Sequence, residues 1–229
     1  MKVGLISDIH GNLPALDAVL GVLDDVDVLV CAGDVVGYYA DPNEVCARLR
    51  DNRVWTIRGN HDAYVLGTME PDPEKRVAYR TDWTRAALMP ENLAWLATLP
   101  VSLVFDWNGK KVTVFHASPW DETTYLYADA PETAQLSLGS DELLVVGHTH
   151  HPVCLPSGQG RLVNPGSVGQ PRDWNPEACC AVLDVDSGEV EFRRARYDVA
   201  GLQTRLEEAG WDPGMISILS RTRQADTAL

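Results

Sequence analysis

The sequence predicts an α/β (α+β) chain that folds as a four-layer αββα sandwich, with two mixed sheets packed face to face and helices outside. Three observations lead to this prediction. The first sixty residues alternate between apolar strand-like runs and amphipathic helical patterns, as in a parallel sheet. Residues 101–115 instead carry a hairpin pattern, and residues 152–197 are rich in strand-forming segments. Helical patterns accompany both halves and can cover the two sheets.

The chain begins with an expected strand over residues 2–7. Asn12 is placed to cap the helix that follows, and Pro14 fits its first turn. One face of this helix is apolar at helical spacing and consists of Leu13, Leu16, Leu20 and Leu23.

Two more strands complete the parallel half. Residues 26–31 form a continuous apolar run, which is expected of a parallel strand covered on both faces. Asp41-Pro42 opens a second helix that extends to about residue 51, and residues 54–57 form the third strand. Ligands of open parallel sheets bind beyond the carboxyl ends of such strands.

The middle of the chain changes pattern twice. Residues 74–98 predict two packed helices that are separated at Met89-Pro90. Residues 101–107 and 110–115 then form two strands around Asn108-Gly109, a strong signal for a type I′ hairpin turn.

The last third is β-rich between a short helix and a closing helix. The short helix is expected over residues 131–138, and a strand over residues 143–146 follows it. Residues 152–197 predict further strands, and residues 199–209 predict the closing helix. The end is polar from about residue 220 and is expected to be loose.

Length and composition favour a single domain over residues 1–229. The chain is 45% hydrophobic, enough for one large core, and shows no internal repeat or linker. No apolar run approaches the roughly 18 residues of a membrane span, and the first strand leaves no room for a signal peptide. The five cysteines are odd in number and lack Cys-x-x-Cys spacing, so reduced thiols and a cytoplasmic protein are expected.

The net charge of −14 restricts the partners. Such a field repels polynucleotides and anionic membranes unless a basic patch overrides it. The nearest candidate is Arg193, Arg194 and Arg196, which we interpret as a solvated strand face. We therefore expect neither long nucleic acid nor a membrane as a partner.

Five polar clusters stand at the ends of apolar runs. They are Asp8-Ile9-His10, Gly33-Asp34, Gly59-Asn60-His61-Asp62, His116 and Gly147-His148-Thr149-His150. Each alone has an ordinary explanation as a turn, a helix cap or a core histidine. Together they hold five of the six histidines, and His151 is interpreted as a neighbour. Mixed nitrogen and oxygen donors suit two divalent metal ions, and paired metals form hydrolytic centres that usually attack phosphorus.

In order and spacing, these clusters resemble the calcineurin-like metallophosphoesterases over residues 8–150. The stretch 164–169 (Asn-Pro-Gly-Ser-Val-Gly) is similar to the small bacterial and archaeal phosphodiesterase branch. The resemblance implies one metal held by Asp8, His10 and His150, a second held by Asn60, His116 and His148, and Asp34 as the bridge between them. It also implies that His61 faces the substrate.

The expected chemistry follows from this ligand set. Two divalent ions outweigh Asp8, Asp34 and a bridging hydroxide, so the site attracts an anionic phosphoryl group. The hydroxide attacks phosphorus in line, and His61 as an imidazolium protonates the leaving oxygen as general acid. Mn²⁺, Fe²⁺, Zn²⁺ and Ni²⁺ all suit such ligands. The sequence leaves the native metal, the physiological substrate and the oligomeric state open.

Departures from the protein phosphatase branch narrow the expected activity. No arginine follows soon after Gly33-Asp34, where residues 35–39 are Val-Val-Gly-Tyr-Tyr, and the next motif ends in Asp62 and not in glutamate. Both features disfavour a protein phosphatase, and the missing arginine also disfavours a symmetric dinucleoside-polyphosphate hydrolase. Small phosphodiesters or nucleotides are the expected substrates. The alternative is a scaffold like the retromer subunit that shares this fold; the complete ligand set and His61 favour the enzyme.

Two features keep two interpretations each, and a third has one. Asp62 either orients His61 or caps the following helix. Tyr38 and Tyr39 either line a pocket or pack in the core. Residues 164–169 are interpreted as a tight turn that supports the site.

Overall fold

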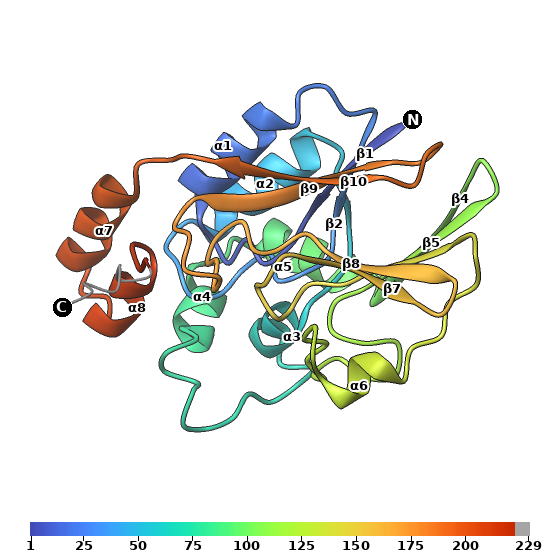
Figure 1. Ribbon diagram of the computed structural model, residues 1–229. Helices are drawn as coiled ribbons and strands as arrows, with labels where there is room; N and C mark the ends of the chain where they lie inside the picture. The colour runs from blue at the N-terminus through green and yellow to red at the C-terminus, as the bar shows by residue number, and fades with distance from the viewer. Residues whose placement is uncertain (223–229) are drawn as a thin grey trace, which may run out of the picture.

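The computed structural model describes residues 1–222 and contains two mixed five-stranded sheets (Figure 1). The first sheet consists, in spatial order, of β10 (Val190–Ala195), β9 (Ala178–Asp184), β1 (Lys2–Ile6), β2 (Val28–Cys31) and β3 (Trp55–Thr56). The second consists of β4 (Ser102–Trp107), β5 (Lys110–Phe115), β6 (Glu142–Val145), β8 (Gly160–Asn164) and β7 (Val153–Ser157). Each sheet combines parallel and antiparallel pairs, as the sequence predicted.

The helices lie outside the two sheets. They are α1 (Leu13–Val22), α2 (Pro42–Asp51), α3 (Asn60–Leu66), α4 (Thr81–Ala87), α5 (Pro90–Thr98), α6 (Pro131–Ala134), α7 (Val199–Glu208) and α8 (Pro213–Ile218). Figure 1 shows α1 and α2 beside the first sheet and the short α6 below the second. The αββα order is confirmed, although its fourth layer is thin.

Three groups of buried side chains fill the spaces between these layers. Val3 and Leu5 of β1 face the space between the sheets, which they share with Val114 of β5. Ile6, the next residue along β1, belongs instead to the core under α1 and α2. This alternation follows from the two-residue period of a strand. Leu144 of β6 packs on the outer side of the second sheet, in the core near α6.

Local signals in the sequence produce the expected turns and caps. The Asn12 side chain accepts a hydrogen bond from the Ala15 N–H at the start of α1 (3.1 Å). Asn108 and Gly109 both have positive φ, of 55° and 81°, as a type I′ turn requires. The hairpin β4–β5 therefore has the predicted register, with Trp107 opposite Lys110.

Other elements differ from the prediction. The helical pattern before Thr81 forms turns, α6 ends at Ala134, and α8 was not expected. The loose end expected from about residue 220 falls mostly on residues 223–229, which lie outside the described residues. Within residues 1–222, no helix combines the length and apolar character needed to cross a bilayer. All five cysteines are free thiols, and four of them are buried.

Candidate metal centre

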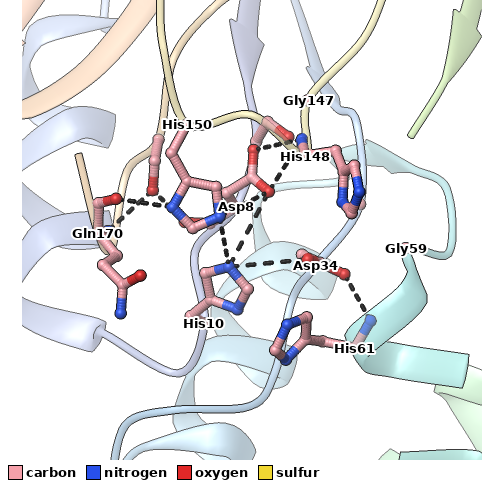
Figure 2. Close-up of polar contacts among 12 residues, drawn as sticks. Asp8, His10, Asp34, Gly59, His61, Gly147, His148, His150 and Gln170 are labelled. Carbon is pink, nitrogen blue, oxygen red and sulfur yellow. Dashed lines mark hydrogen bonds and ion pairs between the residues drawn. The ribbon is translucent and has the colours of Figure 1, made fainter. Parts of the chain in front are cut away.

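All seven predicted ligands lie at one edge of the two packed sheets. Asp8 and His10 follow β1, Asp34 follows β2, His116 follows β5, and His148 and His150 follow β6, while Asn60 begins α3. The fold brings ligand atoms into two groups within 4.8 Å, one from Asp8, His10, Asp34 and His150 and one from Asp34, His116 and His148. Asp34 belongs to both groups, as expected of a bridge, and Figure 2 shows it between His10 and His61.

Each of these four histidines is held by a backbone carbonyl behind it. Nδ1 of His116 contacts the Ala32 oxygen (2.7 Å), and Nδ1 of His150 contacts the Gln170 oxygen (2.7 Å). Nδ1 of His10 contacts Val36 O at 3.4 Å, and in His148 it is Nε2 that contacts Thr123 O (3.0 Å). A carbonyl only accepts hydrogen bonds, so the nitrogen behind each ring donates. The other nitrogen then presents a lone pair to the centre, as in metal-binding histidines.

These lone pairs face one another and need a cation between them. Nε2 of His10 lies 3.1 Å from Nε2 of His150. Nε2 of His116 lies 2.9 Å from Asn60 Oδ1, the acceptor atom of that amide. The two lone pairs of His10 and His150 gain no hydrogen bond from each other, whereas a divalent ion satisfies both. Between His116 and Asn60, either a proton on Nε2 or a divalent ion satisfies both atoms. The donor set of imidazole, carboxylate and amide oxygens therefore fits two borderline divalent metals.

The carboxylates of the centre are fully buried, and their charges depend on the neighbours. Burial raises the pKa of Asp8 to about 7. Burial also opposes ionisation of Asp34, but the charges of His116 and His61 hold the pKa of Asp34 well below its usual range. Burial likewise opposes protonation of His116, and Asp34 outweighs it to raise the pKa of His116 to about 10. This site stabilises positive charge close to Asp34.

The backbone at the centre adopts a conformation that side-chain-bearing residues rarely use. Five of the seven predicted ligands have φ in the left-handed region, namely Asp8 (54°), His10 (54°), Asp34 (55°), His148 (66°) and His150 (60°). Such backbone costs about 1–3 kcal/mol per residue and persists where the surroundings enforce it, typically at functional sites. The strand ends are bent so that their side chains turn toward one point.

Two motif glycines allow this close approach. A Cβ at Gly59 would overlap Asp34 Oδ1 and the Asp34 N–H, and one at Gly147 would overlap the Ser7 hydroxyl. Both glycines precede predicted ligands, so a side chain at either position displaces the carboxylates that the metals need.

A Gly59→Ala variant is expected to bind metal about 10-fold to 100-fold more weakly, because the added methyl displaces Asp34. Metal content after dialysis against graded chelator, measured by mass spectrometry, checks this. Gly21→Ala is the matched control, since a Cβ at Gly21 in α1 meets nothing within 4 Å. That change should stabilise the fold by about 0.5–1 kcal/mol and leave metal affinity unchanged. Equal metal affinity in the two variants would contradict the role given to Gly59.

The structure decides between the two interpretations of Asp62. Its carboxylate accepts hydrogen bonds from the N–H groups of Val35 (3.2 Å), Val36 (3.0 Å) and Gly59 (2.9 Å). The last of these caps α3, and the first two hold the loop that follows Asp34. Asp62 therefore caps a helix and fixes the Asp34 loop.

His61 differs from the four histidines described above. Its backbone N–H donates to Asp34 Oδ1 (2.8 Å), and within residues 1–222 its ring has no carbonyl behind it. The ring packs instead among aromatic side chains, with centroids 4.7 Å from Tyr38 and 4.3 Å from Tyr79. Burial lowers the pKa of His61 to about 4, against the opposing charge of Asp34. Its ring nitrogens are therefore available to a ligand.

A cavity of about 240 Å³, here called the tyrosine cavity, opens beside the centre. Three predicted ligands line it (Asp34, His148 and His150), together with Tyr38, His61, Lys75, Tyr79, Tyr125 and Arg172. Tyr38 thus lines a pocket, whereas Tyr39 is fully buried and its hydroxyl accepts a hydrogen bond from Gln170 Nε2 (3.0 Å).

Arg172 is the functional candidate that the sequence interpretation missed. It is true that no arginine follows Gly33-Asp34, but the chain returns to the site after β8 and brings Arg172 into the tyrosine cavity. Its side chain donates to Gln170 Oε1 (3.0 Å) and to the Tyr38 hydroxyl (3.3 Å), and neither group is charged. A usable signal was present in the sequence, because Arg172 lies three residues beyond the 164–169 motif.

The 164–169 motif itself holds the loops of the centre together. The Ser167 hydroxyl donates to the Asp8 carbonyl (2.7 Å), and Asn164 Nδ2 donates to the Gly147 carbonyl (2.6 Å). It therefore links the loop after β1 to the loop after β6. His151 belongs to neither ligand group and lies beside Tyr127, at 5.7 Å between ring centroids.

Comparisons with known proteins agree with this geometry. The sequence model of the calcineurin-like phosphoesterase superfamily domain matches residues 1–188. The chain is 35% identical over 220 residues to the uncharacterised protein MJ0912 of Methanocaldococcus jannaschii, covering 86% of this chain and 88% of that protein. It is 29% identical over 199 residues to the phosphodiesterase YfcE of Escherichia coli, covering 81% of this chain and 89% of that protein. The crystal structure of a metallophosphoesterase from Sphaerobacter thermophilus matches at a TM-score of 0.81 and 31% identity, covering 96% and 98%. The chain therefore belongs to the calcineurin-like phosphoesterase superfamily, as its motifs indicated.

Proposed function

We propose that this protein is a dinuclear metal-dependent phosphoesterase that hydrolyses small phosphodiesters or nucleotides. The observation that carries the proposal is the pair of ligand groups that share Asp34 beside a cavity containing Arg172 and His61. The similarity to the phosphodiesterase YfcE supports the same reaction class.

The residues divide between two ions. Asp8, His10, Asp34 and His150 would hold one, and Asp34, Asn60, His116 and His148 the other. Mn²⁺, Fe²⁺, Zn²⁺ and Ni²⁺ all fit these donors. When bound, such ions polarise phosphoryl oxygens and make water a nucleophile at neutral pH.

The chain's own residues bind the phosphoryl group and move the proton. Arg172 keeps its charge at any physiological pH. Its guanidinium N–H donors are spaced so that two of them can bond two phosphate oxygens at once. His61 lines the same cavity and can protonate the leaving oxygen. Because burial holds its pKa at about 4 in the free protein, this role requires an anionic substrate that raises the pKa.

The scaffold alternative explains less of this arrangement. A protein that only binds partners on its surface has no need for a histidine without a carbonyl anchor inside a cavity, or for an arginine beside it. We therefore place the scaffold second.

The charge pattern supports a small substrate. The three late arginines are neutralised, since Arg193 pairs with Asp25, Arg194 with Asp173 and Arg196 with Glu177. Residues 193–196 therefore offer no unpaired basic strip to a polynucleotide. The five free thiols favour a reducing compartment, which we propose is the cytoplasm.

A turnover screen tests the proposed function. Chelated protein is supplied with each metal in turn and offered nitrophenyl phosphodiesters, nucleotides and a phosphoserine peptide. We expect metal-dependent cleavage of the diesters. The phosphoserine peptide should turn over more slowly, because the chain carries a net charge of −14 and repels an anionic peptide. Saturable dephosphorylation of the peptide that is faster than cleavage of every diester would refute the proposed substrate class.

A further inference from the structure

A second cavity adjoins the metal centre on the side of His116. It has a volume of about 470 Å³ and is here called the tryptophan cavity; its lining includes Arg58, Met69, Val101, Phe115, Trp120 and Glu122. His116 also lines it, so the cavity and the centre share a residue. A substrate-binding role for this cavity rests on the proposed function.

The walls of the tryptophan cavity are apolar and open to a ligand. Trp120 is 49% exposed and Val101 is 45% exposed, although both are large hydrophobic side chains. Exposed apolar groups that surround a cavity are typical of a binding site. Indole faces stack on planar aromatic rings, which makes Trp120 a suitable wall for such a ring.

Two charged side chains in this wall are incompletely hydrogen-bonded. Within residues 1–222, Arg58 Nε and Glu122 Oε1 are buried atoms without a hydrogen bond. Glu122 Oε1 forms an ion pair of 3.5 Å with Nη2 of Arg58, so its charge is matched. Buried donors are usually satisfied, so Arg58 Nε is the polar atom that this cavity leaves for a ligand.

One loop separates the tryptophan cavity from the tyrosine cavity. Thr123 lines the tryptophan cavity, and its carbonyl is the anchor of His148. Tyr125, two residues later, stacks on His148 with ring centroids 4.0 Å apart and lines the tyrosine cavity. His116 thus lines one cavity and His148 lines the other. A diester bound at the centre would direct one substituent toward each.

We propose that the tryptophan cavity is the subsite for a planar aromatic ester group that stays on phosphorus. His61 lines only the tyrosine cavity, so the leaving oxygen lies on that side. A water oxygen bonds to phosphorus and releases one proton to solvent, and the P–O bond toward His61 breaks with its electron pair on oxygen. His61 supplies the proton that this oxygen takes up and is then reprotonated from solvent. The products are an alcohol and a phosphomonoester that keeps its aromatic group beside Trp120. The preferred substrates are thus diesters with an aromatic retained group.

Two diesters with the same leaving group test this proposal. Bis(p-nitrophenyl) phosphate retains an aryl group, and methyl p-nitrophenyl phosphate retains a methyl group. Trp120→Ala should lower kcat/KM for the first by about 10-fold to 100-fold, because aromatic stacking is lost, and leave the second nearly unchanged. Trp120→Phe should restore most of the loss. Trp55→Ala is the control, since Trp55 is 55% exposed but lies outside the cavity.

Binding without turnover separates this proposal from the proposed function. Calorimetry with diphenyl phosphate and dimethyl phosphate should show tighter binding of the diphenyl ester, and Trp120→Ala should remove that preference. If metal-loaded protein cleaves neither nitrophenyl diester, the proposed function fails, while a preference that depends on Trp120 still supports the subsite. Equal losses for both nitrophenyl diesters, or diphenyl phosphate binding unchanged in Trp120→Ala, would overturn the subsite.

Discussion

Replacing Asp34 with asparagine is expected to reduce phosphodiester turnover by about 10³-fold, the largest effect of any single substitution at the centre. Asp34 is the one residue that belongs to both ligand groups, so its charge would support both proposed ions. His10→Gln should cost less, because His10 belongs to one group. Metal content per chain, measured with kcat on the same samples, checks the reason for the loss.

A second buried aspartate serves as the control for this substitution. Asp41 is only 6% exposed and pairs with Arg205, away from the ligand groups. Asp41→Asn should therefore lower the midpoint of thermal unfolding and leave metal content and turnover unchanged. A larger loss of activity in His10→Gln than in Asp34→Asn would show that Asp34 is not shared between two metals.

Replacing His61 with alanine, outside the ligand groups, is expected to have an effect whose size depends on the leaving group. Alkyl and nucleoside groups leave badly without a proton, so their release should slow by about 10²–10⁴-fold. Nitrophenolate leaves readily as an anion, and its release should slow much less. Both metals should stay bound, because His61 lies outside the two ligand groups. Rates for the two substrate types and metal analysis of the variant provide the measurement.

The pH dependence gives an independent check on His61. An acid acts only while it is protonated, so alkyl diester turnover by the wild type should fall as pH rises through the pKa of His61 in the complex. This decline should be absent in His61→Ala. His151→Ala is the matched control, since His151 lies near the centre without belonging to it. Equal slowing of both leaving groups with full metal content would mean that His61 positions the phosphoryl group, and loss of a metal would mean that it is a ligand.

Features that depend on neighbours in the sequence were predicted well. Asn12 caps α1 and Asn108-Gly109 forms its turn because both effects act within a few residues. That the predicted ligands lie together was also predictable, since the ends of neighbouring parallel strands meet at one edge whatever the loop details. Sequence periodicity does not locate the ends of very short helices. The predicted length of α6 was therefore too great, and α8 was not predicted.

Features that depend on distant contacts were not predictable in the same way. Arg172 reaches the tyrosine cavity because the chain returns past His150, whose ring is anchored by the Gln170 carbonyl. Nothing near Asp34 in the sequence indicates this arginine. Asp62 was open to two roles because its partners Val35 and Val36 belong to another loop. A binding role for Trp120 is suggested only by the cavity that it lines, which the sequence does not show.

Strand β1 pairs with one strand close to it in the sequence and one far from it. This determines at what stage of synthesis the centre can form. During synthesis, β1 can pair with β2 early, but its other neighbour β9, at Ala178–Asp184, emerges from the ribosome last among its partners. His148, His150 and the carbonyl of Gln170 also follow long after Asp8. A nascent chain therefore offers only a fragment of the ligand set. On the proposed function, metal uptake would come after folding, and the ions available to the finished protein would decide which metal it carries.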